Sequence, residues 1–493
     1  NEEAEGHYRR ALELARNDSE RAPLLAGLGE ALSRQSRFDE AIETYRQGIE
    51  LYRGLGDLDG VAGAYARAAQ AAWWGVGPPQ GLQLCQEGIE AVADAPESPN
   101  LCLLLHEAAR AHHFSSHPVR ALSLCQQALE MAERLGVVGI RADALVTWGI
   151  LPDKTPEEAL EALEHALELA EEAGLLHIAG RALNNLGVIR HAQLGDLTTE
   201  RHYFSRAAAL DRQVGNVTGE IYYLGNLFES SASLGDFEDA EASLLRIRHL
   251  LGQVDDPGLA GNVASLREAM ILIYRGDWAE AVRMLRECQP ASRRRGLLAN
   301  LENVDRTLSR ALLELCALGA AAQEADWDEA SAALVEAIEL GEGVRYPQEM
   351  VWCYCCLSVI WAHRGQLEEA RSRLAEARST AGQQPNPVAE AALLWAEATL
   401  AAAEERWPEA LTAFDALVAI YARLGMRWDW ARNLIDWAGA HRARGEPGDL
   451  ERERELLRES QEMFTGMGIL RYAALAEERL QALPAVRALR AEE

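Results

Sequence analysis

A short corner motif that recurs with variations along the chain constrains the fold more than any other feature of the sequence. Its fullest form is Gly276-Asp277-Trp278-Ala279-Glu280-Ala281, and close variants begin at Ser36, Gly235, Ala325, Gly365 and Glu405. Glycine tolerates the positive φ at which many helices end, and the small Ala lets two helices approach closely. The motif therefore predicts a tight turn between two helices, with the aromatic or Leu side chain filling the corner.

A buried helix face follows the corner. In Ala330, Leu334 and Ala337 a large apolar residue comes four positions after the corner Ala, and a small one three positions later. This i, i+4, i+7 stripe is typical of a helix that buries one face. The corner position recurs at Ala4, Ala41, Gly81, Ala121, Ala159, Glu200, Ala240, Ala281, Ala330, Ala370 and Ala410.

A recurrence of about 40 residues is the signature of a solenoid, in which each helical hairpin buries its face against its neighbours. We therefore predict an all-α fold, a right-handed superhelical solenoid of about 11–12 helical hairpins. Loops rich in Pro and Gly fall in step with the repeat, so we expect one solenoid over residues 1–493. Residues 449–493 are expected to form C-terminal capping helices.

The start of the chain has its own pattern. The sequence begins on Asn1, and Ala4, Tyr8 and Ala11 already show the spacing of a second helix. We therefore expect the chain to start in the middle of a repeat, as a fragment of a longer polypeptide.

The composition narrows the classes of partner and compartment. A formal net charge of −29 argues against direct binding of nucleic acid, which requires a basic face. No apolar run has the roughly 18 residues of a membrane span, and no signal peptide opens the sequence. The 8 cysteines form no double Cys-x-x-Cys pattern, so a zinc site is not expected. Unpaired cysteines in a helical chain are typical of the reducing cytoplasm.

The two halves of the repeat resemble the tetratricopeptide repeat, most clearly in Leu28-Gly29…Ala41-Tyr45 and in Leu186-Gly187…Phe204-Ala207. The unit is longer than the standard one of that family, and this longer form resembles the MalT-like sensor domains of bacterial signal-transduction ATPases with numerous domains (STAND). The resemblance implies an upstream ATPase module in the same polypeptide and a role as the sensor of a multidomain regulator.

Catalytic motifs are absent from the sequence. The single Lys154 follows Pro152-Asp153 and has no phosphate-binding glycine loop. His106-Glu107-Ala108-Ala109-Arg110 places Arg where a His-Glu-x-x-His zinc motif needs its second His. No nucleophile elbow or dinucleotide fingerprint occurs. We therefore expect no enzyme, no cofactor and no metal.

Binding in a groove lined by the first helices is the expected activity, because stacked hairpins curve and turn these helices to the concave side. We align the first helices by taking Gly187 as the small residue of its repeat. The positions that then face the groove carry polar and aromatic side chains. The predicted ligand-binding residues are Gln70, Trp73, Trp74, His106, Arg110, His113, Arg181, Asn184, Asn185, His191, Tyr222, Asn226 and Glu229.

Two functions remain open. The first is a sensor that binds a small polar ligand, such as a sugar or metabolite, and so relieves autoinhibition. The second is a scaffold that binds a peptide or partner domain, for which Arg110, Arg181 and Arg310 offer positive charge. An enclosed polar pocket would favour the small ligand, whereas an open basic or apolar groove would favour the protein partner.

Overall fold

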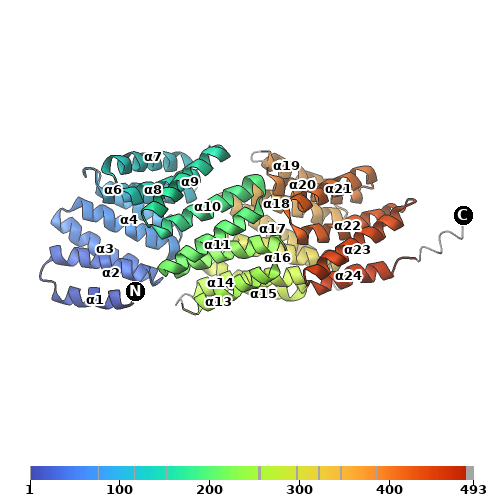
Figure 1. The fold of residues 1–493 in the computed structure, drawn as a ribbon, viewed down its shortest axis with the longest axis horizontal. Coiled ribbons are helices and arrows are strands. Elements are labelled where there is room, and N and C mark those ends of the chain that lie inside the picture. The colour runs from blue at the N-terminus through green and yellow to red at the C-terminus, as the bar shows by residue number, and fades with distance from the viewer. Residues whose placement is uncertain are drawn as a thin grey trace. The chain divides into compact units, whose positions relative to one another are not determined.

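A computed structural model describes residues 2–75, 77–115, 117–151, 154–253, 257–295, 298–319, 323–344, 347–382 and 386–484. Within these residues the fold is all-α, with 24 helices and no strand (Figure 1). Consecutive helices pack as hairpins. The predicted fold class is therefore confirmed, because the second to twenty-third helices make eleven hairpins, with one further helix at either end.

The even-numbered helices are the first helices of the hairpins, except the last of them, which follows the final hairpin. These helices are α2 Asp18–Ser33, α4 Leu58–Gly75, α6 Pro99–Phe114, α8 Val138–Gly149, α10 Leu176–Leu194, α12 Val217–Ser233, α14 Pro257–Arg275, α16 Leu298–Leu318, α18 Pro347–His363, α20 Pro387–Ala403, α22 Arg427–Arg444 and α24 Leu470–Gln481.

The helices that follow the corners have odd numbers. They are α1 Glu2–Leu14, α3 Phe38–Leu55, α5 Pro78–Ala91, α7 Pro118–Leu135, α9 Pro156–Glu172, α11 Leu197–Val214, α13 Phe237–Leu251, α15 Trp278–Arg295, α17 Glu324–Val344, α19 Leu367–Ala381, α21 Trp407–Leu424 and α23 Asp449–Gly466.

The chain divides into two compact units. Unit 1 comprises Asn1–Ile189, His202–Leu224 and Arg248–Pro257, and unit 2 comprises Arg190–Arg201, Gly225–Ile247 and Gly258–Glu493. Each unit has its own buried clusters of apolar residues.

The corner motif behaves as predicted in most places. Gly276 and Gly365 have φ of 91° and 72°, and Ser36 and Glu405 adopt the same left-handed conformation at 60° and 58°. The corner alanines are fully buried where α3, α7, α13, α15, α17, α19 and α21 begin. The variant at Ala325 is an exception, because α17 already starts at Glu324, before the motif.

The small residues of the first helices allow the close approach that the sequence predicts. A Cβ on Gly29 would lie 2.7 Å from Cε1 of Tyr45, and a Cβ on Gly187 would lie 3.0 Å from Cε1 of Phe204. Atoms at such separations overlap, so only glycine lets these helices pack at this distance.

The cysteines and the corner tryptophan Trp278 are part of the core. Six cysteines are buried and all eight are free. Burial raises the pKa of the Cys125 and Cys353 thiols to about 12, so these thiols are protonated and unreactive at neutral pH. Trp278 is 4% exposed. In the described part of the chain, no helix combines the length and apolar character needed to cross a lipid bilayer.

Candidate functional site

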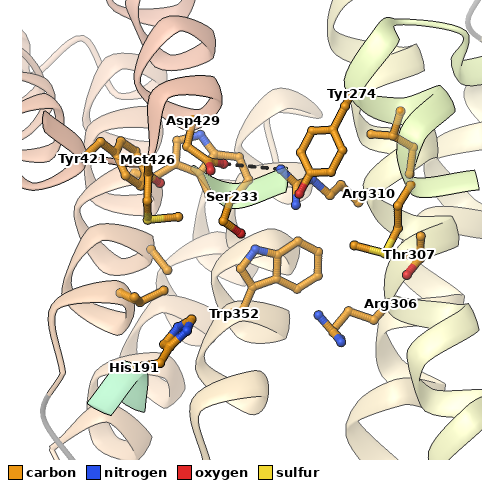
Figure 2. Close-up of a pocket in the computed structure, with 15 residues that line it drawn as sticks. His191, Ser233, Tyr274, Arg306, Thr307, Arg310, Trp352, Tyr421, Met426 and Asp429 are labelled. Atoms are coloured by element: carbon orange, nitrogen blue, oxygen red, sulfur yellow. Dashed lines mark hydrogen bonds and ion pairs between the residues drawn. The ribbon is translucent and has the colours of Figure 1, made fainter. Parts of the chain in front are cut away.

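The first helices of unit 2 converge on a pocket of about 230 Å³ (Figure 2). The repeat explains this convergence, because each first helix turns the same face inward. Seven first helices from α10 to α22 contribute to the lining, through His191, Ser233, Tyr274, Arg310, Trp352, Trp395 and Asp429.

Two arginines one turn apart on α16 give the pocket its charge. Arg306 Nη2 donates to Asn303 Oδ1 at 2.6 Å, but its Nε is buried and has no hydrogen-bond partner among the described residues. Arg310 Nη2 reaches Asp429 Oδ1 only at 3.3 Å. Like charges at i, i+4 on a helix repel each other, so an anion placed between these two guanidinium groups would be stabilised.

The acids beside these arginines neutralise them incompletely. Glu302 Oε1 lies 3.4 Å from Arg306 Nε, and burial raises the pKa of Glu302 to about 7. Burial also raises the pKa of Asp429. Glu302 is therefore partly protonated at neutral pH and balances less of the positive charge of Arg306.

Aromatic rings and a histidine complete the pocket. The guanidinium carbon of Arg310 lies 5.2 Å from the ring centroid of Tyr274, and that of Arg306 lies 6.0 Å from the ring centroid of Trp352. Burial alone would lower the pKa of His191, but its hydrogen bond of 2.9 Å to Glu200 raises it. Rings beside charged donors suit an anion with a flat or apolar body.

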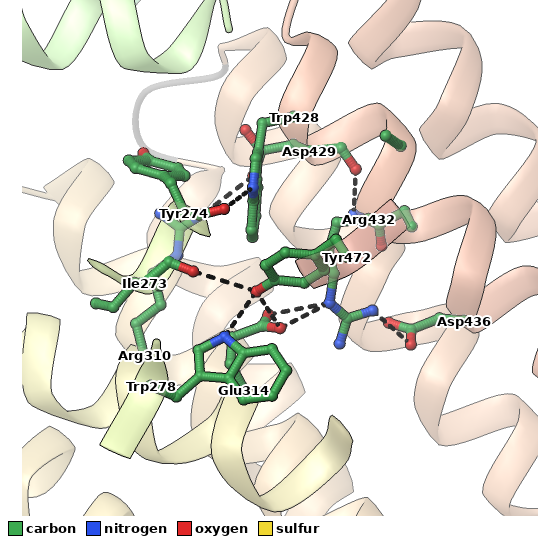
Figure 3. Close-up of polar contacts among 12 residues, drawn as sticks. Ile273, Tyr274, Trp278, Arg310, Glu314, Trp428, Asp429, Arg432, Asp436 and Tyr472 are labelled. Atoms are coloured by element: carbon green, nitrogen blue, oxygen red, sulfur yellow. Dashed lines mark hydrogen bonds and ion pairs between the residues drawn. The ribbon is translucent and has the colours of Figure 1, made fainter. Parts of the chain in front are cut away.

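A buried polar cluster next to the pocket joins α14–α16 to α22 and α24 (Figure 3). The hydroxyl of Tyr472 accepts from Trp278 Nε1 at 2.9 Å and donates to Glu314 Oε2 at 3.0 Å. Glu314 also accepts from Arg432 Nε at 2.8 Å, and Trp428 Nε1 donates to the carbonyl of Tyr274 at 3.1 Å. These bonds fix α22, which carries Asp429, against α14 and α16.

The first tryptophan of α22, Trp428, lies in the interior of unit 2. Trp428 is 1% exposed, and its ring contacts those of Tyr274, Phe464 and Tyr472. Packing is therefore the role of Trp428.

Five of the predicted ligand residues come together in unit 1: Gln70, Trp73, His106, Arg110 and Arg181. They lie on α4, α6 and α10, and their partners are polar residues of the same cluster. Gln70 Nε2 donates to Glu107 Oε1 at 2.8 Å. Arg110 Nη2 lies 3.4 Å from Glu107 Oε2, and its guanidinium carbon lies 5.1 Å from the ring centroid of Trp73.

The remainder of this cluster is more deeply buried. His106 is fully buried, and its Nε2 lies 2.9 Å from Thr147 Oγ1. Arg181 forms an ion pair with Asp143, and the pKa of Asp143 is lowered because Arg181 and other cations outweigh the effect of burial. The sequence frame selected His106 and Arg181 but missed Glu107, Asp143 and Thr147.

The other predicted residues of unit 1 do not join this cluster. The ring of His113 contacts that of Phe114 at 4.8 Å. Asn184 Nδ2 donates to Asn185 Oδ1 at 3.3 Å, and Tyr222 is 49% exposed. The side chain of Trp74 lies outside the described residues.

In unit 2, His191 is the predicted ligand residue that lines the pocket. Glu229 binds Arg267 Nη2 at 3.0 Å, and the carbonyl of Asn226 accepts from Ser230. The alignment stopped at α12 and so missed Arg306 and Asp429, whereas Arg310 was named only as positive charge for a peptide partner. The same alignment, applied to the first helices from α14 to α22, would have identified them.

Comparison with known proteins identifies the repeat at the start of the chain. Residues 1–54 match the tetratricopeptide repeat family. This segment includes Leu28-Gly29 and Ala41-Tyr45, and helical hairpins continue beyond it to α22 and α23. No curated protein matches the chain in sequence.

Several solved structures share the helical arrangement. The Cut9–Hcn1 hetero-tetramer of the APC/C is 12% identical over 97% of this chain and 88% of that chain, with a TM-score of 0.48. A Rap protein in complex with competence and sporulation factor is 12% identical over 86% and 97%, with a TM-score of 0.38.

A STAND protein from Pyrococcus horikoshii with a tetratricopeptide repeat sensor is also similar in structure. It is 14% identical over 69% of this chain and 52% of that chain, with a TM-score of 0.40. The chain therefore spans about half the length of that protein.

Proposed function

We propose that this chain is a non-catalytic binding module whose unit 2 pocket takes a small organic anion, such as a carboxylate or a phosphate ester. The observation that carries the proposal is the buried Nε of Arg306, which has no hydrogen-bond partner among the described residues. The ion pair with Glu302 Oε1 at 3.4 Å compensates this donor only in part, and a buried donor without a hydrogen bond costs about 1–3 kcal/mol. An anion that accepts from Arg306 and Arg310 would remove this cost.

The size of the pocket favours a small ligand over a peptide. Its volume of about 230 Å³ lies just below the range of roughly 300–1,000 Å³ that is typical of small-molecule sites. A helix or an extended peptide needs a longer groove with several side-chain pockets. Positive charge, rather than neutral polar groups, makes an anionic metabolite a better fit than a neutral sugar.

Binding at this place would suit a sensor. The ligand would contact α16 through Arg306 and Arg310, α18 through Trp352 and α22 near Asp429. It would therefore favour the conformation in which these helices converge, and a ligand shifts a conformational equilibrium by its difference in affinity for the two states. Under this proposal the chain is the input module of a multidomain signalling regulator, in which ligand binding relieves autoinhibition.

The test is a binding screen with the full chain. Isothermal titration calorimetry against carboxylates, phosphate esters, amino acids and neutral sugars is expected to give hits among the anions. Arg306→Gln and Arg310→Gln should each weaken such a hit by at least about 10-fold, because each removes a charge-assisted hydrogen bond.

Arg283→Gln is the matched control, because Arg283 is an exposed arginine of α15 that pairs with Glu280 and Glu287. Its affinity for the anion should equal that of the wild type. A neutral sugar that binds wild type and Arg306→Gln equally would contradict the anionic ligand. If none of these compounds binds and acidic peptides do, the chain is a protein-binding scaffold instead.

A further inference from the structure

Three potential metal ligands meet in the buried cluster of unit 1. His106 and Glu107 are adjacent on α6, and Asp143 lies on the next first helix, α8. His106 Nδ1 is 3.5 Å from Glu107 Oε1 and 3.9 Å from Asp143 Oδ2. One ligand atom of each residue lies within 4.8 Å of the other two. The three residues are 0%, 2% and 9% exposed.

The hydrogen bonds of His106 leave a lone pair directed at the two carboxylates. The hydroxyl of Thr147 donates to the carbonyl of Asp143 at 3.4 Å, so in the tautomer with the proton on Nε2 its oxygen accepts from His106 at 2.9 Å. Nδ1 is then the unprotonated nitrogen, and it has no hydrogen-bond partner among the described residues. In this tautomer no proton lies between Nδ1 and the two carboxylate oxygens, so these acceptors repel one another and a shared cation would remove the repulsion.

We propose that His106 Nδ1, Glu107 Oε1 and Asp143 Oδ2 bind a divalent transition-metal ion of the Zn²⁺ type. Nitrogen and carboxylate ligands about 2.0–2.2 Å from one Zn²⁺ ion are separated by roughly 3–4 Å, which matches the separations measured from Nδ1. The mixture of one imidazole and two carboxylates favours Zn²⁺ over Ca²⁺ or Mg²⁺, which prefer oxygen ligands alone.

The residues around the three ligands orient them as an outer shell does in a metal site. Thr147 fixes the tautomer and the ring plane of His106. Gln70 and Arg110 hold Glu107. Arg181 pairs with Oδ1 of Asp143, so that Oδ2 is the oxygen that faces His106.

The guanidinium groups of Arg110 and Arg181 limit the affinity of the site. They balance the charges of Glu107 and Asp143, so the ion adds positive charge to a buried cluster. We therefore expect weaker binding than in a structural zinc site built from thiolates, with one ion per chain. The sequence search missed this site because the ligand that follows His106-Glu107 comes from α8 and not from one turn further along α6.

The test measures Zn²⁺ binding to the full chain, purified without a histidine tag and freed of metal with a chelator. Competition with a chromophoric chelator and elemental analysis after equilibrium dialysis should both give one bound Zn²⁺ per chain. His106→Gln should abolish this binding, and Glu107→Gln or Asp143→Asn should each weaken it by at least about 10-fold, on the scale known for changes around metal sites. Zn²⁺ should also raise the thermal unfolding midpoint of the wild type but not that of His106→Gln.

His113→Gln is the matched control, because His113 lies on the same helix outside the cluster, and it should bind Zn²⁺ as the wild type does. Circular dichroism checks that each variant is folded. If His106→Gln does not fold, Glu107→Gln and Asp143→Asn, which preserve side-chain size, decide the question. Zn²⁺ binding that is unchanged in these variants, or absent from the wild type, would overturn the proposal.

Discussion

Asp211, near the end of α11, is a buried acid with only part of its hydrogen-bonding capacity used. It is 1% exposed, and its Oδ2 accepts from Asn216 Nδ2 at 3.0 Å. Its Oδ1 has no partner among the described residues. Burial raises the pKa of Asp211 to about 7, from an ordinary value of about 4. The folded state therefore binds a proton more tightly than the unfolded state does.

This pKa shift predicts that stability depends on pH through Asp211. The contribution of the protonated carboxyl is fully present below about pH 4 and is lost as the pH rises through about 7. Asp211→Asn cannot ionise. When the pH is raised from 5 to 8, its free energy of unfolding should therefore increase by roughly 2–4 kcal/mol relative to that of the wild type. Urea denaturation at both pH values measures this difference. The exposed Asp39→Asn is the control, and a pH-independent difference for Asp211→Asn would refute the burial argument.

At the scale of the helical hairpin, the glycine corners differ in what surrounds them. Gly276 and Gly365 both have positive φ, at 91° and 72°. A Cβ on Gly276 would lie 2.6 Å from Cγ of Arg471 on α24, whereas a Cβ on Gly365 would meet no atom within 4 Å. Thus α24 packs closely on one corner, and the other corner is open.

This difference separates backbone strain from packing. Gly365→Ala should cost about 1–2 kcal/mol, the penalty for placing an L-residue in the left-handed region. Gly276→Ala should cost at least about 1 kcal/mol more, because Arg471 and α24 must also move. Chemical denaturation gives both values, and hydrogen exchange should show faster exchange in α24 for Gly276→Ala alone. If both variants lose the same free energy of unfolding, the displacement of Arg471 and α24 costs nothing measurable and the packing argument is wrong.

The sequence could predict the hairpins because their signals are local. Gly276 ends a helix through its own backbone freedom, and Gly29 faces Tyr45 of the next helix. The pocket could not be predicted in the same way. Arg306 and Arg310 are separated from Asp429 by more than 100 residues, and they meet because seven first helices turn inward in unit 2. The repeat predicts which side of each first helix points inward, but it does not predict which first helices come close enough to form a pocket.

Charge is the property that concerns the molecule as a whole. The chain has 77 acidic and 48 basic residues, and many of its arginines form exposed ion pairs with the adjacent hairpin. Examples are Arg134 with Glu97 and Arg206 with Glu171. An exposed pair of this kind contributes only about 0–1 kcal/mol. The net charge of −29 has a different effect, because the excess negative charges repel one another throughout the folded chain.

We therefore expect self-repulsion to outweigh the ion pairs, so that salt stabilises the protein. The Debye length falls from about 30 Å at 0.01 M salt to about 8 Å at 0.15 M, which screens repulsion between distant charges more than attraction within a contact pair. At pH 8 the thermal unfolding midpoint should rise by a few degrees when NaCl is increased over this range. Near the sequence pI of about 4.9 the net charge vanishes, and the same change in salt should have little effect or lower the midpoint. A midpoint that falls with salt at pH 8 would instead make the ion pairs between hairpins the dominant electrostatic contribution to stability.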